Sequence, residues 1–266
     1  MEIQARERWR KAVESWATPL HLFGVDEGTP FAVRLPLLAD RTVDGDPTPT
    51  IAAVDHLSTG AGSVVDVSIG VERLVGDLAR RGYRVTAVCS GLDEARRIGG
   101  VSRVTALVGE WPVIASNAGL HDVAVSTHAV FDTAAIGPFI EALSRTARRG
   151  VVIEATVKHP MAAFAKYITA LHGHDLPKGP TLDDLVSAIT EVTGTAPFVE
   201  RWRAPAAPRF DDLTDLLLFY RRVLLITPEQ SIEASGLLES AVEQADDGRF
   251  VLGPPERDLA TIWWRG

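Results

Sequence analysis

Cysteine is nearly absent from this chain of 266 residues, which contains one thiol, Cys89. A single cysteine excludes disulfide bonds within the chain and any zinc site built from several thiolates. Chains without disulfides are typical of reducing compartments. We therefore expect a cytoplasmic protein.

Positive charge and long apolar runs are also scarce. The chain has 27 Lys and Arg against 35 Asp and Glu, a formal net charge of −8 at pH 7. This balance disfavours an extended basic face for nucleic acid. No apolar run approaches the roughly 20 residues that span a bilayer, and the charged first residues do not resemble a secretory signal. The expected partner is a small-molecule substrate, with no nucleic acid and no membrane; homo- or hetero-oligomers stay open.

Three common catalytic motifs are missing. The sequence has no phosphate-binding turn with a Walker lysine, no G-x-S-x-G elbow and no H-E-x-x-H pair. It therefore lacks the marks of a P-loop nucleotidase, a serine hydrolase of the elbow type and a zinc peptidase. Tandem repeats and low-complexity tracts are absent as well.

Short apolar runs that alternate with amphipathic segments dominate the middle of the chain. Continuous apolar runs, rather than alternating ones, are typical of strands that are buried on both faces of a parallel sheet. The pattern predicts an α/β fold with a doubly wound, mostly parallel sheet. The expected strands are 63–67, 84–88, 104–108, 122–126 and 151–153, and the helices between them are 71–81, 92–98 and 136–148.

The two flanks of this region are less regular. Residues 3–17 have helical spacing, and a loop-rich arm with one short helix at 35–41 follows. We assign residues 1–55 to an N-terminal helical arm or lid and 56–266 to one compact α/β domain. The arm's Trp9, Trp16, Phe23 and Phe31 fit either a lid over a substrate or ordinary core packing. After the sheet we expect helices at 161–171, 181–192, 213–225 and 232–244, a strand at 198–202, and a C-terminal antiparallel hairpin formed by 249–252 and 259–264.

The turn after the first expected strand is the first place to look for a ligand. In open α/β sheets, ligands bind beyond the carboxyl ends of the strands, near the point where the strand order reverses. Residues 66–72 read D-V-S-I-G-V-E, with Gly70 as the one glycine. A nucleotide-binding turn favours glycines because the backbone must approach the ligand closely.

The ordered set of segments resembles class I S-adenosylmethionine-dependent methyltransferases, and more narrowly a group of actinobacterial small-molecule methyltransferases with a tryptophan-containing N-terminal arm. The resemblance runs from about Arg8 to Trp264 and implies a seven-stranded, Rossmann-like methyltransferase fold. It rests on 63–70 (SVVDVSIG), 78–88 (LARRGYRVTAV), 109–112 (GEWP), 122–130 (DVAVSTHAV), 151–160 (VVIEATVKHP), 172–177 (HGHDLP), 179–181 (GPT) and 260–264 (ATIWW).

The resemblance implies S-adenosylmethionine as cofactor and methyl transfer to an oxygen or nitrogen of a small molecule. It also assigns roles to positions after each strand. It places Asp66, Ser68 and Gly70 at the methionine part of the cofactor, Cys89 and Ser90 at the ribose, Glu110 and Trp111 at the adenine, and Thr127 with His128 and Val130 at the methyl-transfer pocket.

Two departures from the family pattern bear on the cofactor. Ser68 and Glu72 occupy positions where the family has glycines, and Cys89 stands where a carboxylate usually binds the ribose hydroxyls. Losing that carboxylate alone would cost on the order of 1.5–3 kcal/mol of binding free energy. A second hypothesis therefore stands beside the first: a methyltransferase-like protein with an eroded site, acting as a non-catalytic partner or using the pocket for another ligand or reaction.

Histidines are the candidate general bases. His128 follows the fourth expected strand and His159 the fifth, so both would lie at the carboxyl edge of the sheet. A third group, His172, His174 and Asp175, fits a metal or an acid–base role, but with no cysteine or second ligand motif nearby we expect no metal. Glu154 fits a paired structural carboxylate better than a catalytic one.

Overall fold

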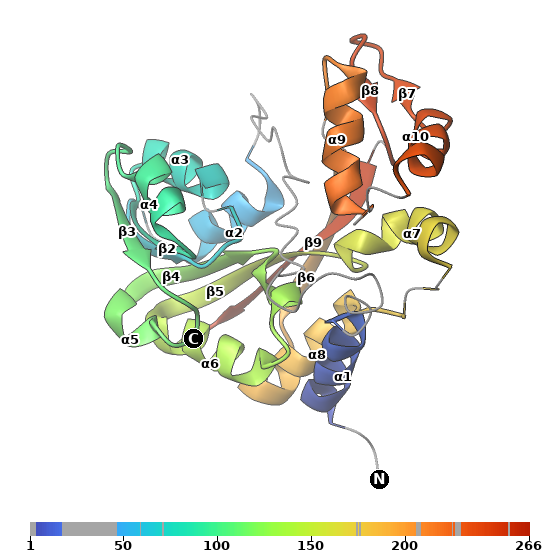
Figure 1. Cartoon of the computed structure of the whole chain (residues 1–266). Coiled ribbons are helices and arrows are strands. Elements are labelled where there is room, and N and C mark those ends of the chain that lie inside the picture. The colour runs from blue at the N-terminus through green and yellow to red at the C-terminus, as the bar shows by residue number, and fades with distance from the viewer. Residues whose placement is uncertain are drawn as a thin grey trace.

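The computed structural model describes residues 4–17, 47–58, 60–70, 72–173, 175, 177–205, 209–224, 226, 230–254 and 256–266. Its centre is a seven-stranded sheet in the order β3-β2-β1-β4-β5-β9-β6 (Figure 1). The strands are β1 (Ser63–Asp66), β2 (Arg84–Cys89), β3 (Val104–Val108), β4 (His121–Thr127), β5 (Ala147–Thr156), β6 (Phe198–Pro205) and β9 (Glu256–Arg265).

The first five strands run parallel, and β9 lies antiparallel between β5 and β6. The predicted doubly wound, seven-stranded, mostly parallel sheet with an antiparallel C-terminal pair is thereby confirmed. Residues 259–264 lie in a strand, β9, as expected, but they do not pair with 249–252 as the expected hairpin required. Residues 250–251 pair with 243–244 in a separate two-stranded sheet, whereas β9 pairs with β5 and β6.

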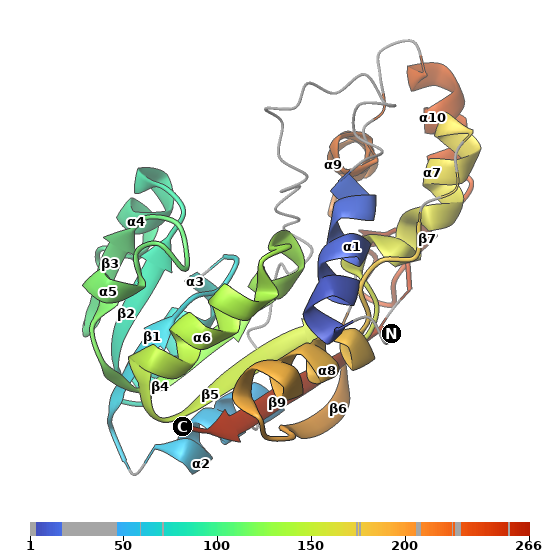
Figure 2. The same cartoon turned by 90° about the horizontal axis from the view of Figure 1, so that it is seen from below.

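One face of the sheet is covered by α6 (Ile136–Thr146), α8 (Leu182–Thr193) and, outside them, α1 (Ala5–Ala17) (Figure 2). The predicted α8 start is confirmed: Thr181 and Asp184 form a capping box that satisfies amides at the helix start. Trp9 of α1 is fully buried, stacks on Phe131, and donates from Nε1 to the carbonyl of Thr133 at 2.9 Å. Of the two interpretations of the arm's aromatics, Trp9 fits core packing; Trp16's side chain, Phe23, Phe31 and the helix expected at 35–41 lie outside the described residues.

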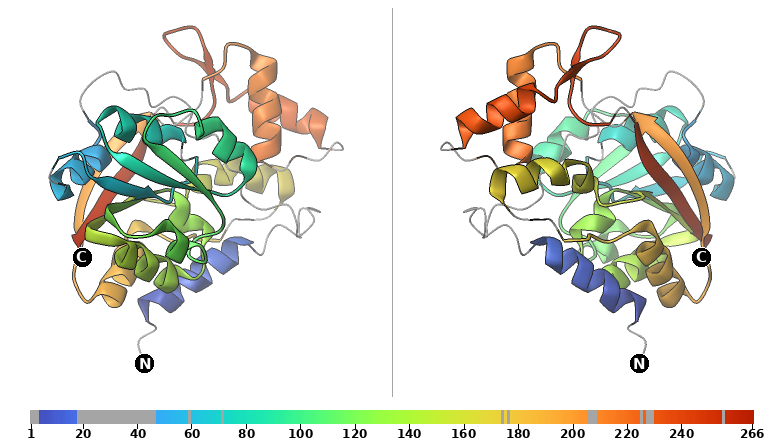
Figure 3. Two further views of the ribbon diagram at one scale, coloured as in Figure 1. Left: turned by 90° about the vertical axis from the view of Figure 1, so that its left-hand side faces the viewer. Right: turned by 90° about the vertical axis from the view of Figure 1, so that its right-hand side faces the viewer.

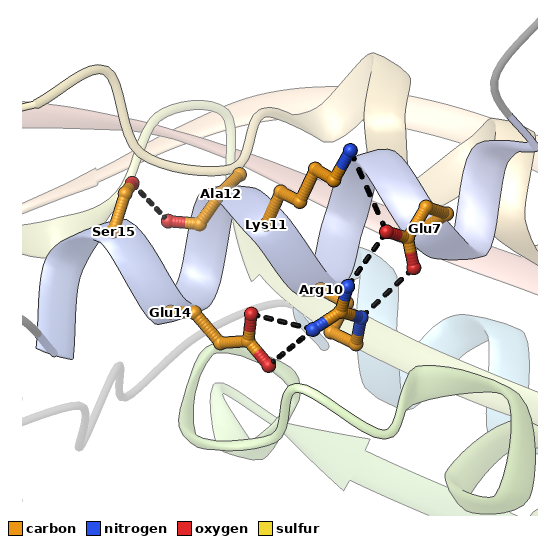
Figure 4. A network of polar contacts seen from close by, with 6 residues as sticks. All are labelled: Glu7, Arg10, Lys11, Ala12, Glu14 and Ser15. Carbon is orange, nitrogen blue, oxygen red and sulfur yellow. Dashed lines mark hydrogen bonds and ion pairs between the residues drawn. The ribbon is translucent and has the colours of Figure 1, made fainter.

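The outer surface of α1 carries a chain of ion pairs (Figure 4). The guanidinium of Arg10 bonds Glu7 one turn before it and Glu14 one turn after it, and Lys11 lies 3.6 Å from Glu7. Each exposed pair of this kind stabilises a helix by only about 0.3–0.5 kcal/mol. These pairs lie within α1, which is anchored to the core by the buried Trp9.

The opposite face of the sheet is covered by α2 (Pro49–Leu57), α3 (Glu72–Arg80) and α4 (Leu92–Ile98). Helix α2 is not among the sequence-based expectations. It begins where Thr48 accepts from the amide of Ile51 and Pro49 takes the first helical position, which needs no amide donor. Thr50 is thereby carried beneath β5 and β9.

A further group of elements forms a side lobe with its own apolar core (Figures 1 and 3). We use this name for η3 (Pro160–Phe164), α7 (Ala165–His172), α9 (Leu213–Val223), α10 (Ser231–Glu239), β7 (Glu243–Gln244) and β8 (Phe250–Val251). Phe164, Tyr220 and Leu252 are buried together in it, and the Tyr220 hydroxyl donates to the carbonyl of Leu252 at 2.7 Å. The lobe stands beyond the carboxyl end of β5. None of the described helices is long and apolar enough to cross a bilayer.

Candidate functional site

A cavity of about 400 Å³ opens at the carboxyl ends of the parallel strands. It lies where the chain order reverses, because β1 has β2 on one side and β4 on the other. This is the position that open α/β sheets use for ligands, and the volume lies within the range of small-molecule sites. The lining includes Ser68, Ile69 and Gly70 after β1, Ser90 and Glu94 after β2, Glu110 and Trp111 after β3, and Asp132 and Thr133 after β4.

The turn after β1 is held against β4 by the Ser68 side chain. Ser68 Oγ donates to Asp66 Oδ1 and accepts from the amide of Thr127 at 2.9 Å. The hydroxyl is therefore engaged with the protein, and Ser68 is 8% exposed. Gly70 follows with φ of +67°, a left-handed conformation that favours glycine. The Glu72 side chain lies outside the described residues.

Asp66 lies behind the cavity wall and is fully buried. No described residue bonds its Oδ2. Burial raises the pKa of Asp66 to about 7, the nearby Glu94 adds to the rise, and the Ser68 hydrogen bond opposes it. The carboxyl is thus poised to change its charge near neutral pH.

At the carboxyl end of β2, the residue that lines the cavity is not the one that the sequence indicated. Cys89 is fully buried, its thiol reaches the carbonyl of Ala87, and it packs in the core under α2 and α3 rather than among the described lining of the cavity. Glu94, in the first turn of α4, lines the cavity instead. Its Oε2 accepts from the Ser90 amide at 2.8 Å and from the Ser90 hydroxyl at 3.1 Å. No described group is bonded to Oε1, which is left as a free acceptor.

The charged residues of this lining have one sign. Glu94, Glu110 and Asp132 are acidic, and no lysine, arginine or histidine is among the described lining residues. Carboxylates around a concave site concentrate a negative potential in it. The cavity therefore favours a cationic or neutral ligand over a phosphate-bearing one.

Trp111 forms an apolar wall of the same cavity. Its ring packs against the core, and Nε1 points to the carbonyl of Phe139 at 3.4 Å. Glu110 beside it is exposed. The structure thus brings Ser68, Gly70, Ser90, Glu110 and Trp111 to one cavity, and it places Asp66, Cys89 and Thr127 behind that cavity; their contacts with a cofactor stay a prediction.

His128, one of the two predicted general bases, is part of a buried polar network. Its Nε2 lies 3.2 Å from Glu154 Oε1, and its backbone has φ of +63°, unusual for a residue other than glycine. Glu154 Oε2 accepts from the Thr50 hydroxyl at 2.6 Å, and Thr50 Oγ1 lies 2.9 Å from Thr261 Oγ1. His128 is 6% exposed and is not among the described lining of either cavity. The expectation that Glu154 is a paired carboxylate agrees with this geometry, and the catalytic role of His128 stays a prediction.

His159, the other predicted base, lines a second cavity of about 370 Å³ between the sheet and the side lobe. Its ring meets the edge of Phe131, with the ring centroids 5.5 Å apart. Burial lowers the pKa of His159 to about 4, so the imidazole is neutral at physiological pH. A neutral imidazole is the form that can accept a proton.

Only His172 and Asp175 of the third histidine group are among the described residues. No cluster of three potential ligand side chains occurs among the described residues. His172 Nε2 lies 2.8 Å from the carbonyl of Leu224, a contact within the side lobe. Asp175 accepts from Thr169 at 3.2 Å, and His174 lies outside the described residues.

No protein-family model matches the chain, and no curated protein matches it. Solved structures do. A candidate methyltransferase from Bacillus halodurans C-125 superposes with a TM-score of 0.52 at 13% identity, covering 82% of this chain and 99% of that one. A candidate methyltransferase from an antibiotic biosynthesis pathway of Anabaena variabilis ATCC 29413 superposes with a TM-score of 0.52 at 16% identity, covering 79% and 95%. The chain therefore has the fold of class I methyltransferases, as the sequence resemblance implied.

Proposed function

We propose that this protein transfers a methyl group from S-adenosylmethionine to an oxygen or nitrogen of a small molecule. The observation that carries the proposal is the acidic cavity at the point where the strand order reverses. Its three described charged residues are all carboxylates. Such a lining suits a ligand with a positive centre and opposes the diphosphate of a dinucleotide.

The residues of this chain fit the cofactor better than the sequence suggested. Glu94 would bind the ribose hydroxyls through Oε1, because Ser90 already holds its Oε2 and so fixes the carboxylate. Gly70 presents no side chain at its position in the turn after β1, and Trp111 offers an apolar surface for the adenine. When bound, S-adenosylmethionine supplies an electrophilic methyl group on a positively charged sulfur.

The protein's own task is then to position the acceptor and to receive a proton. A hydroxyl acceptor gains the methyl group and loses its proton, so a neutral base nearby assists the reaction. His159 lines the adjacent cavity, whereas His128 is not among the described lining of either cavity, which makes His159 the better placed of the two predicted bases. The substrate is a small molecule; the acidic surface balance speaks against nucleic acid.

The alternative, a methyltransferase-like protein that does not methylate, has one observation in its favour. The carboxylate expected at the end of β2 is replaced by the buried Cys89. Glu94 offsets this loss only if its position in α4 allows it to reach the ligand. Cofactor binding separates the two functions.

A Glu94→Gln substitution should weaken S-adenosylmethionine about 10- to 100-fold. The glutamine keeps an acceptor for Ser90 but removes the charge, and a hydrogen bond to a charged group is worth about 1.5–3 kcal/mol. The measurement is isothermal titration calorimetry with S-adenosylmethionine and S-adenosylhomocysteine.

Asp93→Asn is the matched control. It removes the same charge from the neighbouring residue of α4, which is exposed and pairs with Arg96 at 3.2 Å. This control should change affinity less than about twofold. No heat with the parent protein at millimolar ligand would overturn the methyltransferase proposal, and equal losses in the two variants would show that Glu94 makes no direct contact.

A further inference from the structure

The second cavity combines a mostly apolar wall with two uncharged polar groups and four charged residues. It is bounded on one side by the segment after β5 and the start of β9, and on the other by the side lobe through Phe164 and Leu252. Ala162 and Ala163 of η3 also face it, and their small side chains leave its volume open. An apolar cavity with a few polar groups is the usual form of a small-molecule site.

Thr156 is the first polar group. It lines the cavity and is 6% exposed, yet its Oγ1 has no hydrogen-bond partner among the described residues. A buried hydroxyl without a partner is unfavourable, because it has lost its hydrogen bonds to water. A ligand with a hydroxyl or another polar atom at this position would satisfy Thr156.

His159 is the second polar group, and it is uncharged at neutral pH. Its ring lies against Phe131, which immediately precedes Asp132 of the first cavity. The two cavities are therefore neighbours, separated by the segment of η2 (Ala129–Asp132) that follows β4.

The formal charges of the second cavity balance. Among its described lining residues are two cations, Lys158 and Arg257, and two carboxylates, Glu256 and Asp258. The two carboxylates pair with Arg203 on β6. The described lining residues therefore carry no net formal charge, in contrast to those of the acidic first cavity. It gives neither an anion nor a cation an electrostatic advantage.

We propose that the second cavity is the acceptor site and that it selects an uncharged, largely apolar molecule carrying a hydroxyl group, with Thr156 and His159 as its polar contacts. The inference rests on the proposed function, because it names the substrate class of that reaction. The side lobe supplies the apolar wall and so sets the size of the acceptor.

The test uses 2-naphthol, a fluorescent, neutral, hydroxyl-bearing probe, and 2-naphthoate as its charged counterpart. The parent protein should bind 2-naphthol at least tenfold more tightly than 2-naphthoate. Thr156→Val keeps the shape of the side chain and removes the hydroxyl, so it should weaken 2-naphthol about fivefold, the worth of one neutral hydrogen bond. Thr156→Ser keeps the hydroxyl and should stay within about twofold of the parent.

Folding is controlled by thermal unfolding of each variant. Because the Thr156 hydroxyl has no described partner, Thr156→Val should unfold at a temperature no lower than the parent. Equal binding of 2-naphthol by the valine and serine variants, or equal binding of the naphthol and the naphthoate, would overturn the assignment. Titration of the same sample with S-adenosylhomocysteine tests the proposed function separately: no heat there overturns the function, whatever the naphthol result.

Discussion

The Asp66→Asn variant is expected to gain stability over the parent as the pH rises from 4 to 8, by roughly 4 kcal/mol of free energy of unfolding. Burial raises the pKa of Asp66 from 3.8 to about 7. Below pH 4 the carboxyl is protonated in both states, so parent and variant differ little in their response to pH. Above pH 4 the unfolded chain releases the proton and the folded protein keeps it, until the folded form must bury a charge above pH 7. One pKa unit corresponds to about 1.4 kcal/mol, which sets the size of the effect.

The measurement is urea unfolding of parent and variant at matched pH values from 4 to 8. The difference between them is the informative quantity, because His159 acts in the opposite direction. Its pKa is lowered to about 4, so the folded protein gains stability from it as the pH rises from 4 to 6.5. In the parent, the effects of Asp66 and His159 on the free energy of unfolding oppose one another over this pH range. In Asp66→Asn, the free energy of unfolding should therefore rise with pH between 4 and 6.5, because only the His159 effect remains.

Asp122→Asn is a matched control in which the pKa of the carboxyl is shifted in the opposite direction. The carboxylate of Asp122 accepts from the Ser63 amide at 2.8 Å, and this bond, with the neighbouring arginines, lowers its pKa. Its contribution to stability is present above the unfolded pKa and is lost as the pH falls, so this variant should lose stability relative to the parent at neutral pH. If Asp66→Asn followed the same course, the buried carboxyl would have to be charged and stabilised in the folded protein.

The second large effect concerns the buried pair formed by Glu154 of β5 and His128, which follows β4. Glu154→Ala should destabilise the protein by about 3–5 kcal/mol, since it leaves His128 and the Thr50 hydroxyl without the carboxylate between them. Both partners are less than 7% exposed, so water does not replace the lost contacts. Chemical unfolding at pH 7 measures the change.

Glu141→Ala is the control for this substitution. Glu141 is exposed on α6 and pairs with Arg145 at 3.5 Å, an interaction worth at most about 0.5 kcal/mol. Glu154→Gln, which still accepts from Thr50, should fall between the two. A loss below about 1 kcal/mol in Glu154→Ala would mean that the network does not depend on the carboxylate.

Much of the sheet could be predicted because parallel strands are buried on both faces and read as continuous apolar runs. Residues 104–108 and 92–98 coincide with β3 and α4, and the other inner elements differ at their ends. Strand β5 begins at Ala147, inside the expected helix 136–148. The sequence did not show this boundary because the two arginines in 147–149 fit a helix end as well as a strand edge. The pairing of 250–251 depends on contacts within the side lobe, which local spacing does not encode.

The lining of the first cavity was indicated in its turns but not in Glu94, and the cofactor contacts of these residues stay a prediction. The strand ends pointed to the turn after β1, and the family resemblance pointed to Ser68, Gly70, Ser90, Glu110 and Trp111, all of which line the cavity. Glu94 was missed because its role depends on α4 turning its first residues back over the end of β2. The usable signal was an acidic residue four positions after Ser90 in the first turn of an expected helix, the spacing at which side chains meet. The same geometry means that a carboxylate introduced at position 89 would be buried in the core.

The position of β9 in the sheet has a consequence for the order in which the protein folds. Residues 256–265 lie between β5 and β6, although β5 leaves the ribosome about a hundred residues earlier. Until β9 emerges from the ribosome, the edge of β5 that faces away from β4 has no strand to pair with, and neither has β6. Unpaired strand edges promote association between chains. The sheet is therefore completed only after β9 has been translated. The long sequence separation between the paired strands predicts slow folding.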